Sequence, residues 1–124
     1  MFIKKRKICV VINNRANYAR IKYFLTEAKK IKNLDVSIIL GASANLSRYG
    51  NLEQTINKDG FKISNRISTI VEGENLISMA KSTALSIMEL TSIFEKIKPQ
   101  IVLTVADRFE TLATAIASSY MNIF

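Results

Sequence analysis

Two short polar segments hold the residues best suited to chemistry. The first, residues 13–20, reads NNRANYAR and contains Arg15 and Arg20. Guanidinium groups bind phosphates and carboxylates through paired hydrogen bonds, so these two arginines are candidates for holding an anionic ligand. The other interpretation is that both are ordinary exposed arginines of a basic protein. The pattern by itself leaves the two interpretations open.

The second polar segment, residues 107–110, reads DRFE and brings together Asp107, Arg108 and Glu110. A carboxylate held beside an arginine can act as a general base or acid. Acidic residues at the start of a helix are also ordinary caps and partners of the helix dipole. Taken alone, the residues do not decide between catalysis and capping.

Composition excludes several other kinds of site. The chain has 124 residues, no histidine and one cysteine, Cys9. These counts rule out a Ser-His-Asp triad, a Cys-His dyad and an internal disulfide, and we expect no metal site. No GxGxxG or Walker A segment follows the first apolar run. A magnesium-binding receiver domain needs acidic residues where residues 13–15 read Asn-Asn-Arg.

The charge and hydropathy patterns indicate which kinds of binding partner to expect and where in the cell the protein is expected. The net charge is +8, from 18 basic and 10 acidic residues, with a basic run at residues 4–7. We interpret that run as a solvated arm and expect no nucleic-acid partner. No apolar run reaches about 18 residues, so we predict no membrane-spanning helix. A reducing cytoplasm is the expected location.

Apolar runs predict the strands that position the two polar segments. Short, β-rich runs typical of strands buried on both faces occupy residues 7–13, 36–40 and 101–105. A less regular extended segment is expected at residues 61–71. Cys9, inside the first run, is expected to be a small buried hydrophobe.

Helical periodicity and capping residues predict four helices between these strands. They are expected around an apolar stripe at residues 21–31, at 52–57, from the N-cap Asn75 to about Lys98, and at 108–120. Pro99 ends the long helix. Its core-facing side is predicted to contain Ile77, Met79, Ala80, Ala84, Ile87, Met88 and Phe94.

This alternation of strands and helices predicts a doubly wound α/β domain. The sheet should be parallel, covered by helices on both faces, with the first strand in a central position. Ligands of open parallel sheets bind beyond the carboxyl ends of the strands. Both polar segments follow predicted strands, so we expect them to meet at that edge.

Together the two segments resemble the signatures of hydrolysing UDP-N-acetylglucosamine 2-epimerases. The segment NRANYAR is similar to the family's N-R-A-D-Y, and VADRFETLATAIASSYMNI resembles G-D-R-F-E followed by an alanine-rich helix and N-I-P. The segments GASANLSRYGN, INKDGF and MAKSTALSIMELTSIFEKIKPQIVLT also look like family segments. The resemblance extends from Lys7 to Ile123.

The resemblance implies a Rossmann-like sheet that forms the N-terminal half of a glycosyltransferase-B-like two-domain fold. Residues 1–124 would form one domain, with the C-terminal nucleotide-binding domain absent and the chain alone inactive. The full-length enzyme, implied to be a homo-oligomer, would eliminate UDP from a UDP-sugar and add water. The product would be N-acetylmannosamine or a related 2-epimer for nonulosonic (sialic or legionaminic) acid synthesis. No cofactor and no membrane are implied. The alternative is a non-catalytic nucleotide- or anion-binding Rossmann-like module.

The resemblance also implies four substrate-binding residues. Arg15 matches the family arginine near the diphosphate, and Arg20 lies where related members carry a lysine. Ser43 is on the loop that approaches the sugar. Asn17 replaces the family aspartate, which is a departure from the pattern, and it is kept as a candidate.

Three further residues are implied to be catalytic. Asp107 matches the signature aspartate, with a role in acid–base chemistry. Arg108 is the adjacent signature arginine, and Glu110 is expected to orient it. Ala106 stands where the signature usually has glycine.

Overall fold

A computed structural model describes residues 4–41, 44, 51–69, 75–105 and 108–124. Within these residues one sheet contains β1 (Arg6–Ile12), β2 (Leu34–Leu40), β3 (Asn65–Arg66) and β4 (Ile101–Thr104). The strands are parallel and lie in the order β3-β2-β1-β4. The helices are α1 (Arg15–Ala28), α2 (Leu52–Lys58), α3 (Leu76–Ile97) and α4 (Phe109–Tyr120).

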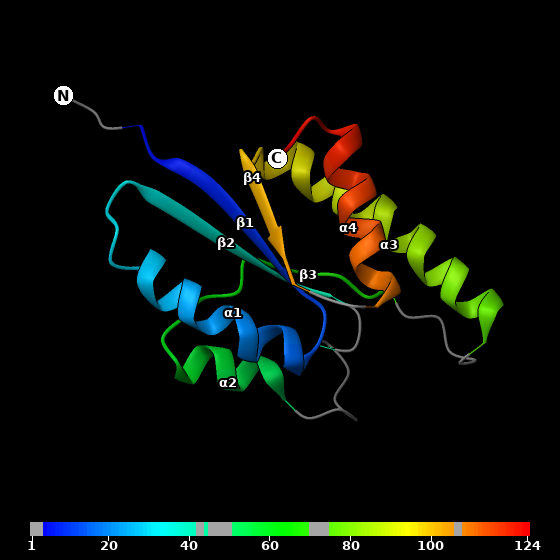
Figure 1. Ribbon diagram of the computed structural model, residues 1–124, viewed down its shortest axis with the longest axis horizontal. Coiled ribbons are helices and arrows are strands. Elements are labelled where there is room, and N and C mark those ends of the chain that lie inside the picture. Colours follow the sequence, from blue (N-terminus) through cyan, green and yellow to red (C-terminus); the bar gives the residue numbers. More distant parts are fainter. Residues whose placement is uncertain (1–3, 42–43, 45–50, 70–74, 106–107) are drawn as a thin grey trace.

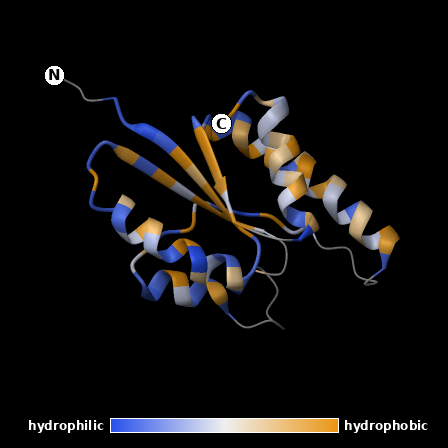
Figure 2. Ribbon diagram, in the orientation of Figure 1, coloured by the Kyte–Doolittle hydropathy of each residue, from blue (hydrophilic) through white to orange (hydrophobic). Residues whose placement is uncertain are grey.

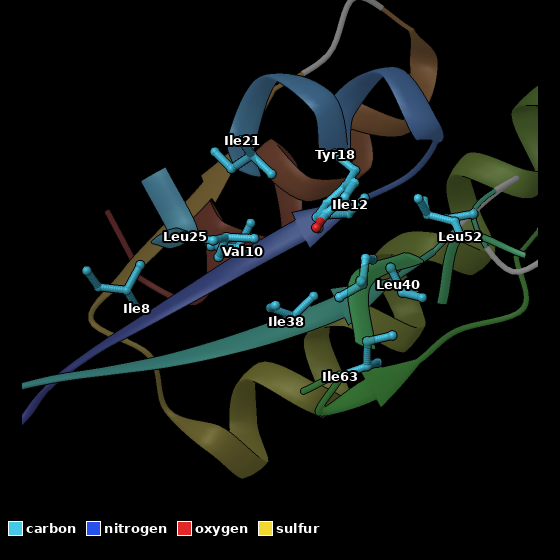
Figure 3. Packing of buried hydrophobic residues seen from close by; sticks show 12 residues of the cluster. Ile8, Val10, Ile12, Tyr18, Ile21, Leu25, Ile38, Leu40, Leu52 and Ile63 are labelled. Carbon is cyan, nitrogen blue, oxygen red and sulfur yellow. The ribbon is translucent and has the colours of Figure 1, made fainter. Parts of the chain in front are cut away.

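Helices cover both faces of the sheet, with α1 and α2 on one side and α3 and α4 on the other (Figure 1). The two cores follow the alternation of strand side chains. Val10 and its register partner Ile38 pack in the cluster on the α1 and α2 side (Figure 3). Val11 and its partner Ile39 pack on the α3 and α4 side. The doubly wound parallel sheet with a central first strand is therefore confirmed.

The apolar runs locate three strands within one or two residues. The extended segment expected at residues 61–71 is largely wrong, because only β3 pairs as a strand there, opposite Ile39 and Leu40. Buried Ile63 and Ile67 hold the irregular chain around it against the core. Residues 70 and 71 lie outside the described part.

The ends of α3 follow their sequence signals. Asn75 is the N-cap: its side chain accepts a hydrogen bond from the Ser78 N–H, and the Ser78 hydroxyl accepts one from the Asn75 N–H. Lys98 ends the helix in the left-handed conformation, directly before Pro99. The predicted span of the long helix is confirmed.

The predicted core face of α3 is wrong. Its buried residues are Ser78, Ser82, Ser86, Leu90 and Phe94. Of the predicted stripe only Phe94 is fully buried, whereas Ile77, Ala80, Ala84 and Met88 are exposed, and Met79 is not part of the core. The cause is α4, which packs closely on α3 and whose buried residues after Glu110 are all small: Ala113, Thr114, Ala117 and Ser118.

The single cysteine, Cys9, lies within β1. Cys9 is fully buried, as predicted, and burial raises the pKa of its thiol to about 12.

Among the described residues, none of the helices combines the length and hydropathy needed to cross a lipid bilayer.

Candidate functional site

The described parts of the two polar segments, residues 13–20 and 108–110, lie at the point where the topology of the sheet reverses. From β1 the chain runs through α1 to β2 on one side, whereas β4, the other neighbour of β1, leads into α4 on the opposite face. The carboxyl ends of β1 and β4 point to the same edge, where α1 and α4 begin (Figure 1). Open α/β sheets bind their ligands at such a switch point.

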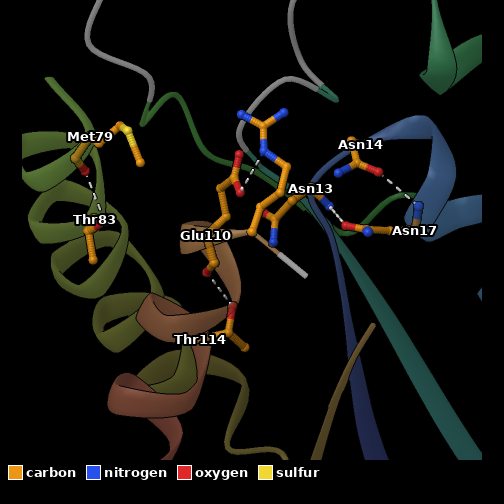
Figure 4. Close-up of polar contacts among 8 residues, drawn as sticks. Asn13, Asn14, Asn17, Met79, Thr83, Glu110 and Thr114 are labelled. Atoms are coloured by element: carbon orange, nitrogen blue, oxygen red, sulfur yellow. Dashed lines mark hydrogen bonds and ion pairs between the residues drawn. The ribbon is translucent and has the colours of Figure 1, made fainter. Parts of the chain in front are cut away.

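Three asparagines build the turn from β1 into α1. Asn14 is the N-cap, and its Oδ1 accepts a hydrogen bond of 2.8 Å from the Asn17 N–H. The side chain of Asn17 turns back, and its Oδ1 accepts a hydrogen bond of 3.1 Å from the Asn13 N–H. Figure 4 shows both bonds beside the end of β1. Asn17 is 2% exposed, so the structure gives its oxygen an internal role in shaping this turn.

Arg15 is the first residue of α1, and Arg20 follows in its second turn. Five helical residues separate their directions by about 140° around the axis. Both side chains are exposed, and neither guanidinium forms an ion pair with a described residue. Arg15 is the one at the helix N-terminus, where backbone N–H groups also favour an anion.

Arg108 is held between two neighbours at the start of α4. Its Nε lies 3.5 Å from Oε2 of Glu110, and its guanidinium carbon lies 5.7 Å from the centre of the Phe109 ring. The Arg108 side chain is 54% exposed, whereas that of Glu110 is 3% exposed. Neither carboxylate oxygen of Glu110 accepts a hydrogen bond from the described residues. The ion pair and the N-terminus of α4 are therefore the described groups that stabilise its charge.

The Glu110 carboxylate orients the Arg108 guanidinium from its buried side, and the rest of the guanidinium faces solvent. Figure 4 shows the Glu110 carboxylate on the same side of the molecule as Asn13 and Asn17. Arg108 is the N-cap of α4 but makes no side-chain capping bond there. Chemically, the edge offers two arginines and two helix N-termini to an anion such as a diphosphate.

Asp107 and Ser43 lie outside the described residues, so their predicted roles stay predictions. The internal role of Asn17 and the capping role of Asn14 were not predicted from the sequence. An Asn before a helix is a known N-cap signal. Here α1 begins at Arg15, earlier than its apolar stripe indicates, so Asn14 is the N-cap and residues 15–20 form the first turns of the helix.

A separate polar contact fixes the position of α1. The Tyr18 hydroxyl donates to Asp59, which follows α2, and Lys22 Nζ lies 3.0 Å from the same carboxylate. The hydrogen bond from Tyr18, followed by that from Lys22, lowers the pKa of Asp59. Burial, followed by the Asp59 carboxylate, raises the pKa of Tyr18. These contacts tie α1, and with it Arg15, to α2.

The chain also matches a known protein family. The sequence model of the family described as UDP-N-acetylglucosamine 2-epimerase matches residues 26–124. The chain belongs to this family. The matched region includes Arg108 and Glu110. It begins after Arg15, Asn17 and Arg20, which the longer alignments described next include.

Two curated relatives of this epimerase family are similar over nearly the whole chain. A GDP/UDP-N,N'-diacetylbacillosamine 2-epimerase (hydrolyzing) of Campylobacter jejuni is 31% identical over 121 residues, which are 98% of this chain and 31% of that protein. A UDP-N,N'-diacetylbacillosamine 2-epimerase (hydrolyzing) of Legionella pneumophila is 33% identical over 118 residues, 95% of this chain and 31% of that protein. The chain therefore spans about a third of the length of these relatives.

The fold agrees with a solved member of the epimerase family as well. A crystal structure of a UDP-N-acetylglucosamine 2-epimerase superposes with a TM-score of 0.81 at 25% identity, covering 97% of this chain and 32% of that one. The Rossmann-like sheet predicted from the sequence is thus the fold found in the corresponding third of this enzyme.

Proposed function

We propose that this chain is the N-terminal part of a hydrolysing 2-epimerase that acts on a UDP-linked 2-acetamido sugar. The observation that carries the proposal is the family membership, together with two hydrolysing relatives at 31% and 33% identity. The names of these relatives favour UDP-N,N'-diacetylbacillosamine as substrate, with UDP-N-acetylglucosamine as the other candidate. The free 2-epimer would supply nonulosonic acid synthesis.

The proposed reaction has two balanced steps. A base removes the proton at C2 of the sugar while the C1–O bond to the diphosphate breaks, and the bonding pair leaves with UDP. The resulting glycal then gains a hydroxyl group at C1 and a proton at C2 from the opposite face. The sum is UDP-sugar plus water giving UDP plus the free 2-epimer.

Positively charged groups at the switch point favour the first step of this reaction, the departure of the diphosphate. Negative charge develops on the diphosphate as the C1–O bond breaks, so fixed positive groups there lower the barrier. Arg108, braced by buried Glu110, and Arg15, at the N-terminus of α1, are the residues to which we assign this role. Asp107 is proposed as a proton-transfer group on the basis of the signature it matches.

The remaining candidates receive narrower roles. We assign Arg20 to an outer contact with the diphosphate, because its direction around α1 differs from that of Arg15. Asn17 is assigned to substrate binding through Arg15, because its side chain holds the turn that carries Arg15. Ser43 is proposed to approach the sugar.

The complete site is proposed to lie between this domain and a second, C-terminal nucleotide-binding domain in the full-length protein. On that basis residues 1–124 alone bind UDP poorly and are inactive. The full-length protein is proposed to be a cytoplasmic homo-oligomer that needs no cofactor.

The test uses the full-length protein that contains this chain. It is incubated in heavy water with UDP-N-acetylglucosamine and, separately, with UDP-N,N'-diacetylbacillosamine, and the products are followed by NMR. We expect UDP and a free 2-epimer carrying one deuterium at C2. An epimer still attached to UDP would refute hydrolysis. Failure to release UDP from either sugar would favour the non-catalytic anion-binding module.

A further inference from the structure

A second charged surface lies at the amino ends of the strands, opposite the edge that carries the candidate site. Residues 4–7 lead into β1, read Lys-Lys-Arg-Lys and are all exposed. The Arg6 N–H donates a hydrogen bond of 2.8 Å to the carbonyl of Asn33, so exposed Lys32 lies beside this run. Figure 2 shows hydrophilic residues where β1 begins and in the connection from α1 to β2. The run is therefore part of a larger surface.

A third segment reaches the same surface from the end of α3. The Gln100 N–H donates a hydrogen bond of 2.9 Å to the Lys7 carbonyl, and the Lys7 N–H donates one of 3.0 Å to Gln100 Oε1. Exposed Lys98, the C-cap of α3, therefore lies on the β4 side of β1, whereas Lys32 lies on the β2 side. We call these exposed cations the basic edge: Lys4, Lys5, Arg6, Lys7, Lys32 and Lys98.

The basic edge is not neutralised by the described part of its own chain. None of its six cations forms an ion pair with a described residue. Of the acidic residues in the same segments, Glu27 pairs with Lys30, whereas Asp35 and Glu95 remain. A lysine at the end of a helix offsets the helix dipole, but residues 4–7 precede a strand and have no such role. Like charges held together repel, and an external anionic surface relieves that repulsion.

The side chains of this edge favour an anionic lipid surface over a nucleic acid. Five of the six cations are lysines, which are point charges without the planar fork by which arginine reads or stacks on bases. Lysine clusters of this size bind anionic headgroups through their summed attraction. Ile31 lies between Lys30 and Lys32 and is 47% exposed. An aliphatic side chain offers no ring for base stacking, but it can enter the boundary between headgroups and acyl chains.

We propose that the basic edge binds the anionic headgroups of a lipid bilayer, with Ile31 entering the interface. The sequence alone predicts a solvated arm at residues 4–7, and the neighbours that folding gives this run change that interpretation. Because the edge is opposite the carboxyl ends of the strands, the candidate site stays on the side away from the bilayer. The inference rests on this edge and not on the proposed activity, so the two can fail separately.

Vesicle binding by charge-reversed variants tests the proposal. The full-length protein that contains this chain is sedimented with vesicles of phosphatidylcholine alone and of equal parts phosphatidylcholine and phosphatidylglycerol. We expect binding to the anionic vesicles only, and its loss in about 1 M salt, where charges are screened within about 3 Å. Lys32→Glu and Lys98→Glu should each lower the partition coefficient by at least about fivefold. Lys32→Arg keeps the charge and should bind like the parent.

Lys81→Glu is the matched control, because it makes the same change in net charge at an exposed lysine of α3. About 24 Å of helix separates Lys81 from the end of α3 at the basic edge, well beyond the screening length of about 8 Å. The partition coefficient of this control should therefore change by less than about twofold. Circular dichroism confirms that each variant is folded.

Three results would overturn the proposal. The first is a parent protein that does not bind the anionic vesicles. The second is an equal loss of binding in Lys32→Glu and Lys81→Glu, because the attraction would then follow net charge and not this edge. The third is tighter binding to single-stranded RNA than to the anionic vesicles, which would assign the edge to a nucleic acid.

Discussion

The hydrogen bond from the Asn13 N–H to Asn17 Oδ1 offers a sharp test of how the β1–α1 turn is held. The bond is 3.1 Å long, and Asn17 is 2% exposed, so water has little access to replace it. Asn17→Leu keeps a side chain of similar size but removes the acceptor. Asn17→Asp keeps an acceptor oxygen in the same place and introduces the residue found in the family signature.

The expected magnitudes follow from this burial. Removing one partner from a buried hydrogen bond costs about 1–3 kcal/mol, so Asn17→Leu should lower the free energy of unfolding by about 2 kcal/mol. For a domain of this size the melting temperature should fall by about 8 °C. In Asn17→Asp the helix dipole favours the carboxylate by about 0.3–1 kcal/mol, and desolvation opposes it. The net change should stay within about 1 kcal/mol.

Equilibrium urea unfolding at pH 7, followed by circular dichroism, measures both variants against the parent. Asn51→Ala, which removes the exposed N-cap of α2, is a control for losing an asparagine without burial. Equal destabilisation by Asn17→Leu and Asn17→Asp would show that the Asn17 acceptor does not hold the turn, because only one of the two variants lacks it. A change below about 0.5 kcal/mol in Asn17→Leu would do the same.

Four further predictions follow from the site and its surroundings. In the full-length enzyme Asp107→Asn should lower kcat far more than it changes KM, because it removes a proton-transfer group; steady-state kinetics separates the two. Arg15→Ala should lower kcat and raise KM, since the diphosphate carries charge both in the bound substrate and on departure. The hydrogen bond from Arg66 lowers the pKa of Glu53, so this pair adds stability above about pH 4.3 and loses it as the pH falls further. Glu53→Gln should therefore destabilise by less than about 1 kcal/mol at pH 7, and its difference from the parent should shrink as the pH is lowered below about 4.3 in urea titrations. The thiol of Cys9 should react with a disulfide reagent only at the rate of unfolding, which absorbance of the released thiolate records.

The amino-acid sequence by itself was sufficient for the order and type of most elements. The apolar run of β1 and the second half of β2 are buried, and β4 is half-buried, so a continuous hydrophobic stretch is enough to locate each of these strands. Asn75 and Pro99 mark the two ends of α3 by local backbone chemistry, independently of what the helix packs against. The parallel, doubly wound topology then follows from alternation and connection rules.

At the site, the sequence predicted that residues after two neighbouring strands share one sheet edge, and the described residues Arg15 and Arg108 do follow the ends of β1 and β4. Both polar segments reach the same sheet edge because they follow neighbouring parallel strands. Glu110 contacts Arg108 and Asn17 contacts Asn13 within their own segments, but the burial of Asn17 and Glu110 depends on the packing of the elements around them, which the sequence of either segment does not contain.

Tertiary packing alone decided which side of α3 faces the core. Helical periodicity predicts that the side with the largest apolar residues faces the core, because it assumes that the transfer of apolar side chains out of water dominates the free energy of packing. Here α4 presents small residues such as Ala113 and Ala117, and serines at positions 78, 82 and 86 let the two helices approach closely. The rotation of a helix is set by the shape of the surface it meets, and that surface comes from residues more than 20 positions away in the chain. The hydrophobicity of one segment does not contain this information. Ile77 and Met88 are therefore exposed, although the apolar periodicity of α3 predicts that they are buried.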